Sequence, residues 1–265
     1  ETKAVSGLYG AGQFNGTSGY EEAAAQGLVA GVNAVRKFRG QSPFILTRDT
    51  SYIGTLIDDL VTKGTEEPYR IMTSRSEYRL LHRQDNADQR LTAIGAEIGL
   101  VPPERLAAVE EKYDAVRREM NRLESNGVPS SDALNEMLAQ RGSAPVANSA
   151  RLADLLRRPQ VTYGDIAPFD PDRPVLSAAV TNEVEIQIKY AGYLARQEKQ
   201  VAEFKKEESR RLPEGIDYNS ISGLRLEARQ KLSEIRPMSI GQAGRISGVS
   251  PSDIAVLLIW LEQQK

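Results

Sequence analysis

The sequence predicts a mainly α-helical protein that opens with a short βα unit. Residues 103–123 and 180–201 place apolar side chains three and four positions apart, which is typical of amphipathic helices. Near the beginning, glycines crowd between a short apolar stretch and an alanine-rich segment, which indicates a strand, a turn and a helix. We therefore expect a terminal βα unit followed by an all-helical domain with two long helices.

The first predicted element is a short buried strand at Leu8 and Tyr9. The turn after it contains four glycines, which allow positive φ angles or close approach of a ligand: Gly10, Gly12, Gly16 and Gly19. Thr17 or Ser18 can cap the next helix, and Ser18 with Glu21 fits a capping box. The helix carries a face of small residues that can pack tightly on a sheet.

The glycine turn has two interpretations. The unpaired N–H groups and the dipole at a helix N-terminus attract anions, so the turn can hold a phosphate or a cofactor. It can equally be a tight βα turn with a good cap. The spacing G-x-G-x-x-x-G departs by one residue from the dinucleotide fingerprint, and no acidic residue ends a second strand about 20 positions later, as that fingerprint requires.

The next predicted elements are an extended stretch at residues 43–47 and a helix. From Ile53 to Val61 apolar residues recur at helical spacing, and Gly64 is a candidate C-cap. Residues 65–101 have a mixed pattern and are interpreted as a transition into a helical domain.

The strongest periodicity follows Pro102, from Leu106 to Leu123, and forms a coiled-coil seam of barely three heptads. Residues 125–150 are rich in Ser, Asn, Gly and Pro, which indicates a flexible connection around one short helix at 131–140. Leu152, Leu155 and Leu156 mark another short helix.

The second long helix is expected over residues 177–208, with a length of roughly 45 Å. Two long helices joined in this way most simply pair antiparallel. Three further helices are expected at residues 226–235, 240–246 and 251–264, the last with Ser250 as its cap and a proline at its first position.

The final helix has two interpretations, because the apolar run from Ile254 to Leu261 fits either a core or a partner-docking surface with Trp260 as anchor. Residues 241–258 are also similar in outline to a helix-turn-helix, but without an excess of base-reading side chains. The carboxylate pairs Glu21–Glu22 and Asp58–Asp59 are interpreted as structural, since neither lies in an evident pocket.

Composition excludes several function classes. The 265 residues contain 34 Lys and Arg against 36 Asp and Glu, so the near-neutral charge argues against a general nucleic-acid coat. With no cysteine and one histidine, His82, thiolate metal sites, His clusters and a Ser-His-Asp triad are excluded, and no metal site is expected. The longest apolar run is far below the roughly 20 residues that cross a bilayer. No signal peptide is visible in the sequence, and we expect a cytoplasmic protein without a membrane segment.

Two basic clusters can bind phosphate. Arg75, Arg79 and Arg83 lie four positions apart, so on a helix they would form one stripe suited to RNA phosphates. The alternative is a set of ion pairs with neighbouring acids. On the second long helix, Lys189, Tyr193, Arg196 and Gln197 share a face that can stack bases and hold phosphates, or can pack on a neighbouring helix.

Several segments closely resemble the MnmG family, also called GidA. They are AGQFNGTSGYEEAAAQG at residues 11–27, DDL at 58–60, EPYR at 67–70, TSRSEYR at 73–79, DNAD at 85–88, LLRRP at 155–159, VEIQIKYAGY at 184–193 and SIGQAGRISG at 239–248. They span nearly the whole chain in order. The family is the flavoprotein half of the bacterial system that places a carboxymethylaminomethyl group on C5 of the wobble uridine of tRNA.

The resemblance implies that the chain is the C-terminal part of such an enzyme, inactive alone and binding FAD weakly or not at all. It implies a remnant of the FAD-binding α/β domain at 1–64, a transition segment at 65–101, a long-helix domain at 102–208 and a C-terminal helical subdomain at 209–265. The whole enzyme would use FAD with NADH and methylenetetrahydrofolate, act as a homodimer, and work with the GTPase MnmE.

The resemblance also implies roles for particular residues. The flavin would be lined by Gly12, Gln13, Asn15, Gly16, Thr17 and Gly19. Arg75, Arg79, Lys189, Tyr193 and Arg196 would face tRNA, and no catalytic residue is expected in this chain. Two rival functions stay open: a helical protein- or nucleic-acid-binding adaptor without catalytic activity, and a DNA-binding protein that uses the last helices.

Overall fold

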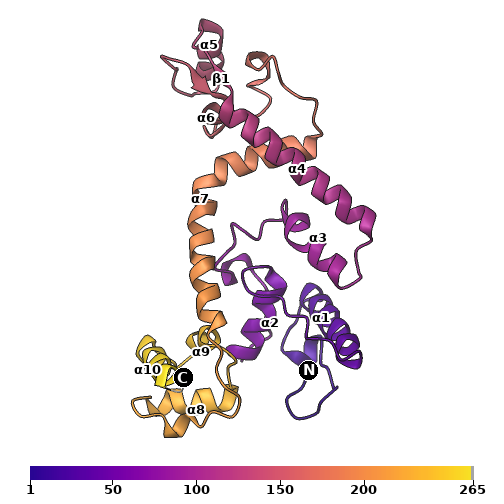
Figure 1. The fold of residues 1–265 in the computed structure, drawn as a ribbon, viewed down its shortest axis with the longest axis vertical. Coiled ribbons are helices and arrows are strands. Elements are labelled where there is room, and N and C mark those ends of the chain that lie inside the picture. Colours follow the sequence, from indigo (N-terminus) through magenta and orange to yellow (C-terminus); the bar gives the residue numbers. More distant parts are fainter. Residues whose placement is uncertain (264–265) are drawn as a thin grey trace. The chain divides into compact units, whose positions relative to one another are not determined.

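The computed structural model describes residues 1–263 and is mainly helical, as predicted (Figure 1). Gln264, the predicted end of the last helix, lies outside the described residues. The chain folds into two compact units. The first joins Glu1–His82 to the segment from Gln197 onward, and the second is Arg83–Arg196. The four-part domain division expected from the sequence stays a prediction.

The strand expected at Leu8 and Tyr9 does not form. The Leu8 N–H donates to Val5 O at 3.3 Å and the Leu8 carbonyl accepts from Thr2 N at 2.8 Å, so both groups are used within one local turn. The Leu8 side chain is 53% exposed. A strand needs a neighbour for its backbone groups, and local bonds have replaced that neighbour here.

Helix α1 spans Tyr20–Phe38 and α2 spans Tyr52–Thr62. The predicted capping box is wrong, because Gly19 is the N-cap of α1 and no side chain caps it. Helix α2 is as predicted; Ser51 caps it by accepting from Gly54 N at 3.0 Å, and Gly64 follows its end with φ +67°. Residues 43–47 are in no strand, and a 3₁₀ turn, η2, covers Thr73–Arg75.

The second unit contains α3 (Ala87–Glu97), α4 (Pro103–Ser125), α5 (Asp132–Gln140), α6 (Leu152–Leu156) and the 3₁₀ turn η3 (Ala167–Phe169). All of these elements except α3, which packs on α4, share one apolar core with the start of α7, Ala178–Ser209. The flexible connection expected at 125–150 is wrong. Strand β1 (Gly127–Val128) pairs antiparallel with β2 (Ala150–Arg151), and Leu134 and Leu138 of α5 are fully buried.

The two long helices do not pair along their lengths. Helix α4 packs mainly on α3 and α6, and it meets α7 only within the shared core, where Val116 and Leu123 join Val184. The buried stripe of α7 ends after Ile188, since Ala191 is exposed. Packing across short elements has therefore replaced the antiparallel pair expected from the sequence.

The first unit has a second apolar core, built from α8 (Leu226–Ile235), α9 (Ile240–Arg245), α10 (Pro251–Gln263) and the turn η4 (Tyr218–Ser220). The N-terminus of α10 is capped reciprocally, because Asp253 N donates to Ser250 Oγ and Ser250 N donates to the Asp253 carboxylate. Trp260 packs against this core, which favours the core interpretation of the last helix, although Ile259 is 58% exposed.

Candidate functional site

The glycine turn, residues 10–19, folds around a single 3₁₀ turn, η1, at Gln13–Asn15. Gly12 and Gly16 flank it with φ of +93° and +87°, in the left-handed region that favours glycine. Asn15 N donates to Gly12 O at 3.0 Å and Gly16 N donates to Gln13 O at 3.1 Å. Of the four glycines expected to allow positive φ, Gly12 and Gly16 adopt it and let the chain bend tightly, whereas Gly10 and Gly19 do not.

Side chains hold the turn from one side. Gln26 of α1 is 2% exposed; its amide donates to Thr17 Oγ1 at 2.8 Å and accepts from Asn15 Nδ2 at 2.7 Å. Thr17 Oγ1 in turn donates to Gly12 O at 3.3 Å. Asn15 and Thr17 therefore support the turn itself. Sequence reasoning missed Gln26, because a lone glutamine in an alanine-rich helix carries no signal of burial.

The other side of the turn is open. Within residues 1–263, the N–H groups of Gly12 and Gly19 donate to no acceptor. Gly12 has open space beside it, since an added Cβ would meet no atom within 4 Å, whereas Gly19 is buried. The Gln13 side chain is exposed, Phe14 is 82% exposed and Tyr20 is 94% exposed. The turn thus offers free donors and aromatic surface at one edge.

A buried carboxylate lies at the N-terminus of α1. Glu22 is 1% exposed and accepts from Ile71 N at 2.7 Å and Arg70 Nε at 3.2 Å. Burial opposes its ionisation, but these bonds outweigh burial and hold the pKa of Glu22 below its usual range. The carboxylate lies so close to Gly19 that a Cβ there would come 1.8 Å from Oε2. Because this helix end already holds a negative charge, it attracts a phosphate weakly and suits a neutral group better.

The arginine segment, residues 70–79, contains the first two predicted RNA contacts. Residues 76–82 are not helical, so the basic stripe of Arg75, Arg79 and Arg83 does not form. Arg75 is exposed, donates to Arg70 O at 2.8 Å and stacks over the Tyr69 ring at 4.3 Å. Arg79 is exposed and pairs with no acid of the described chain, which leaves its charge available.

A buried arginine, Arg48, holds the arginine segment in place. Arg48, 2% exposed, donates to Glu77 at 2.7 Å and to Asp59 at 2.7 Å. Asp58 lies 3.1 Å from Arg48 and is also bound by Arg245 of α9 at 2.7 Å. We call these five residues the Arg48 network.

Burial and charge act in opposite directions on the groups of this network. Burial opposes ionisation of Asp59, but hydrogen bonds from Lys63, Tyr69 and Arg48 outweigh it and hold the pKa of Asp59 below its usual range. Burial also raises the pKa of nearby Tyr78 to about 12. Asp58 and Asp59 therefore act as counter-ions, as the structural interpretation expected, and Arg48 was missed because its partners are distant in sequence.

The sole histidine is structural. His82 is 4% exposed; its Nε2 lies 2.9 Å from Asp49 O and its Nδ1 lies 3.1 Å from Ser76 Oγ. Because a carbonyl only accepts, Nε2 donates to Asp49 O. Ser76 Oγ also accepts from Tyr78 N, so these bonds shape the arginine segment.

The remaining predicted RNA contacts lie on α7. Lys189 donates to Glu185 at 2.7 Å and to Pro159 O at 3.4 Å, so its ammonium is already paired. Tyr193 is 57% exposed, and the Arg196 guanidinium lies 5.7 Å from its ring centre. Gln197 instead bonds the backbone of Leu81 and Glu77. Tyr193 and Arg196 are thus the accessible members of the face.

Comparison with known families decides the relationship of this chain. Residues 103–198 match the model of the tRNA modifying enzyme MnmG/GidA C-terminal helical domain, and residues 200–265 match that of its C-terminal helical bundle. Residues 1–42 match the model of glucose inhibited division protein A. The chain belongs to the MnmG/GidA family.

Individual members of the MnmG/GidA family are similar over the whole chain. The tRNA uridine 5-carboxymethylaminomethyl modification enzyme MnmG of Caldicellulosiruptor saccharolyticus is 56% identical over 263 residues, which cover 99% of this chain and 42% of the relative. The enzyme of the same name from Lachnoclostridium phytofermentans is 54% identical over the same shares. The chain therefore spans less than half the length of these relatives.

A solved MnmG/GidA-family structure has the same fold. Aquifex aeolicus GidA, in its form II crystal, matches with a TM-score of 0.85 and 43% identity, over 98% of this chain and 41% of that one. The likeness extends through both helical family domains and the N-terminal stretch.

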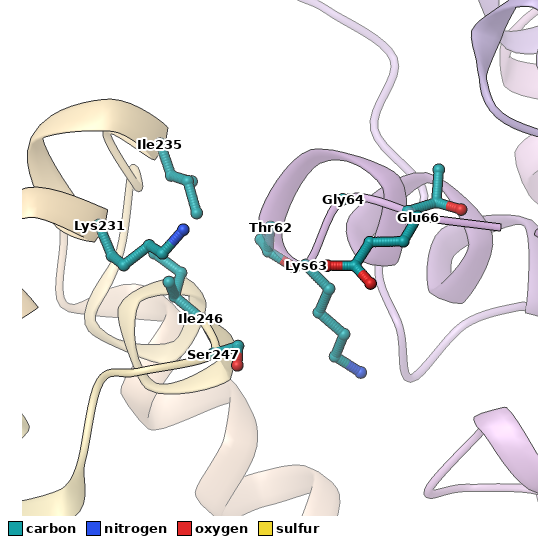
Figure 2. A pocket seen from close by; sticks show the side chains of 9 residues that line it. Thr62, Lys63, Gly64, Glu66, Lys231, Ile235, Ile246 and Ser247 are labelled. Carbon is teal, nitrogen blue, oxygen red and sulfur yellow. The ribbon is translucent and has the colours of Figure 1, made fainter. Parts of the chain in front are cut away.

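A pocket of about 430 Å³ lies between the end of α2 and helices α8 and α9 (Figure 2). Lys63 and Lys231 contribute ammonium groups and Glu66 a carboxylate, and Ile235 and Ile246 line the same side of the pocket as Lys231. Lys63 is paired with the buried Asp59 at 2.8 Å, so its charge is partly used. The mixed lining favours no single charge of ligand, and no predicted site residue lies in this pocket.

Two further features are absent from residues 1–263. No group of three or more His, Cys, Asp and Glu side chains there could hold a metal ion. Nor does any helix in that range combine the length and the apolar character needed to span a bilayer.

Proposed function

We propose that this chain is part of a flavin-dependent enzyme that places a carboxymethylaminomethyl group on C5 of the wobble uridine of tRNA. The proposal rests on its MnmG/GidA membership and, within the chain, on the open edge of the glycine turn. The whole enzyme would use FAD, NADH and methylenetetrahydrofolate, form a cytoplasmic homodimer and act with the GTPase MnmE. This chain alone would be inactive.

The glycine turn fits one edge of a flavin site. The free N–H groups of Gly12 and Gly19 would donate to the flavin, and the exposed amide of Gln13 would add a further contact. Gly16, Asn15 and Thr17 would hold the turn in shape beside the cofactor. Since Glu22 already occupies the helix end, the turn would contact a neutral part of the cofactor. Bound FAD would supply the redox chemistry of the one-carbon transfer.

Amide NMR tests the flavin contact without requiring activity. With FAD in millimolar excess over the 265-residue chain, we expect the Gly12 and Gly19 amide signals to shift. Gly40 is the internal control, because it also has a positive φ and open space at its Cα but lies outside the turn. Equal shifts at all three glycines would contradict the proposed site, and no shift at any of them would show that this chain alone does not bind FAD. FAD that copurifies tightly would contradict the expected weak binding.

RNA would bind through exposed cations. Arg75 and Arg79 would contact tRNA phosphates from the arginine segment, and Arg196 with Tyr193 would do so from α7, with Lys189 beside them.

Binding of unmodified tRNA, measured by fluorescence anisotropy, tests this part. Arg79→Gln should weaken binding and reduce the salt slope by about 1, because one phosphate contact is lost. Arg39→Gln is the matched control, since Arg39 is equally exposed but lies outside the proposed surface. Equal effects of the two variants would contradict the assignment. Duplex DNA binding as tight as tRNA at matched salt would favour the rival DNA-binding function.

A further inference from the structure

Two guanidinium groups and two tyrosine rings form a row on the second unit. The Arg83 guanidinium lies 5.9 Å from the Tyr190 ring centre, and the Tyr190 and Tyr193 ring centres are 6.3 Å apart at an angle of 55°. Arg196 closes the row, 5.7 Å from the Tyr193 ring centre. The tyrosines and Arg196 lie three positions apart on α7, so they occupy neighbouring places on one side of the helix. We call this row the tyrosine ladder.

The two ends of the tyrosine ladder differ in charge. The Arg83 side chain is 14% exposed, with one nitrogen 3.0 Å from Asp85 and 3.7 Å from Glu183. Arg196 is exposed and has no acidic partner among the described residues. Arg83 is therefore neutralised and supports a ring from behind, while Arg196 keeps a free positive charge at the outer end.

The exposed fraction of the two tyrosine rings also increases toward Arg196. Tyr190 is 39% exposed and Tyr193 is 57% exposed, so the accessible ring surface lies next to the free guanidinium. Neither hydroxyl makes a hydrogen bond to the part of the chain that the structure describes. An exposed aromatic face beside an unpaired cation is what a nucleotide needs, because its base stacks and its phosphate pairs with the charge.

We propose that Tyr193 stacks an unpaired nucleobase of RNA while Arg196 binds the adjacent phosphate, with Tyr190 and Arg83 supporting the stacked ring. This inference rests on the proposed RNA contact of α7 and goes beyond it, since it selects single-stranded RNA over duplex. A base inside a duplex has both faces covered by its neighbours, so it cannot use the ring. A site that contacted only the phosphate would bind single-stranded and duplex RNA equally.

The test compares two probes on the 265-residue chain by fluorescence anisotropy: a 12-nucleotide oligouridine and a 12-base-pair RNA duplex. Tyr193→Ala should weaken oligouridine binding by about 5-fold to 150-fold, the range expected for one stacked base. It should leave duplex binding and the salt slope unchanged, and Tyr193→Phe should bind like the parent. Arg196→Gln should weaken both probes and reduce the oligouridine salt slope by about 0.7.

Tyr20→Ala is the matched control, because Tyr20 is also an exposed helical tyrosine, at 94%, and lies outside the proposed RNA surface. Equal losses for Tyr193→Ala on both probes, or no loss on oligouridine that the parent chain binds, would overturn the stacking role and leave RNA binding by α7 intact. A Phe variant as weak as the Ala variant would also overturn it. If the parent chain bound neither probe, the proposed RNA contact would fail, and the inference with it.

Discussion

The interiors of residues 1–82 and of residues 83–196 are stabilised by different kinds of interaction. In the first stretch the buried apolar side chains are Leu56, Tyr69 and Tyr78, and the other fully buried groups are mainly polar or charged, Arg48 and Glu22 among them. In the second stretch a single cluster of leucine, valine, isoleucine and tyrosine fills the interior. The first therefore depends on paired charges and the second on apolar packing.

The difference matters because the two kinds of interior fail differently. Removing one member of a buried ion pair leaves an uncompensated charge, whereas truncating an apolar side chain leaves a cavity. The candidate flavin edge and the arginine segment both lie in the first stretch. The proposed ligand-binding groups of this stretch, unlike those on α7, are thus held by hydrogen bonds and ion pairs that depend on geometry.

The largest expected effect comes from the Arg48 network. Arg48→Met leaves Asp59 and Glu77 without their shared cation, and we expect the free energy of unfolding to fall by about 3–5 kcal/mol. Urea unfolding followed by circular dichroism measures it. Arg39→Met is the control and should change stability by less than about 0.5 kcal/mol, since Arg39 is exposed. A loss below about 1 kcal/mol for Arg48→Met would mean that charge pairing does not hold this region.

Next in size is a cavity in the second region. Leu155→Ala empties a fully buried site on α6 and should cost about 3 kcal/mol in the same urea measurement. Val175→Ala, at a fully exposed position, should change little. If both substitutions cost the same, the apolar cluster would not be the source of stability there.

A smaller effect tests close backbone packing in the first region. A Cβ on Gly54 of α2 would lie 2.1 Å from Thr47 O, so Gly54→Ala must move the backbone and should cost about 1–3 kcal/mol. Gly27→Ala on α1 meets no atom within 4 Å and should stabilise by up to about 1 kcal/mol through helix propensity. Thermal unfolding of both variants compares them. If both variants were stabilised, or both destabilised, the close approach of Gly54 to the Thr47 carbonyl would be refuted.

The pH dependence of stability is expected to have opposite signs in the two regions. The pKa of Asp59 is lowered in the fold, so its ionised form stabilises at neutral pH, and this contribution disappears as the pH falls below about 4. Burial raises the pKa of Glu183, so its ionised form costs stability at neutral pH, and the cost disappears on acidification.

Urea unfolding between pH 3 and pH 7 checks these signs. Asp59→Asn should destabilise at pH 7 and Glu183→Gln should stabilise there, and each difference from the parent should shrink toward pH 3. Glu111→Gln, on the exposed side of α4, is the control. A Glu183→Gln variant less stable than the parent at pH 7 would show that Glu183 is favourably ionised.

The contrast between the regions also explains which parts of the fold could be predicted from the sequence. Helices α4 to α7 were predicted because their apolar residues repeat at helical spacing and are buried on that account. The pairing of β1 with β2 was not predicted, because strands of two residues are too short to show an alternation of apolar and polar side chains. The predicted antiparallel pairing of α4 with α7 was wrong because the buried stripe of α7 stops at Ile188, far short of the end of the helix.

The candidate site was predictable in part for a related reason. Glycine permits a positive φ, so a bend at Gly12 and Gly16 could be expected from the sequence, although Gly10 and Gly19 in the same turn do not adopt one. The burial of Glu22, Gln26 and Arg48 could not, since a polar residue is buried only where a partner meets it. Those partners are distant in sequence, as Glu77 is from Arg48.

Hydrogen exchange on the Arg48→Met and Leu155→Ala variants, read peptide by peptide, tests the central claim that charge pairing holds residues 1–82 while apolar packing holds residues 83–196. We predict that Arg48→Met loses protection in α2 and the arginine segment and keeps it in α4 and α6, and that Leu155→Ala shows the reverse. Uniform loss across both regions in either variant would contradict the account.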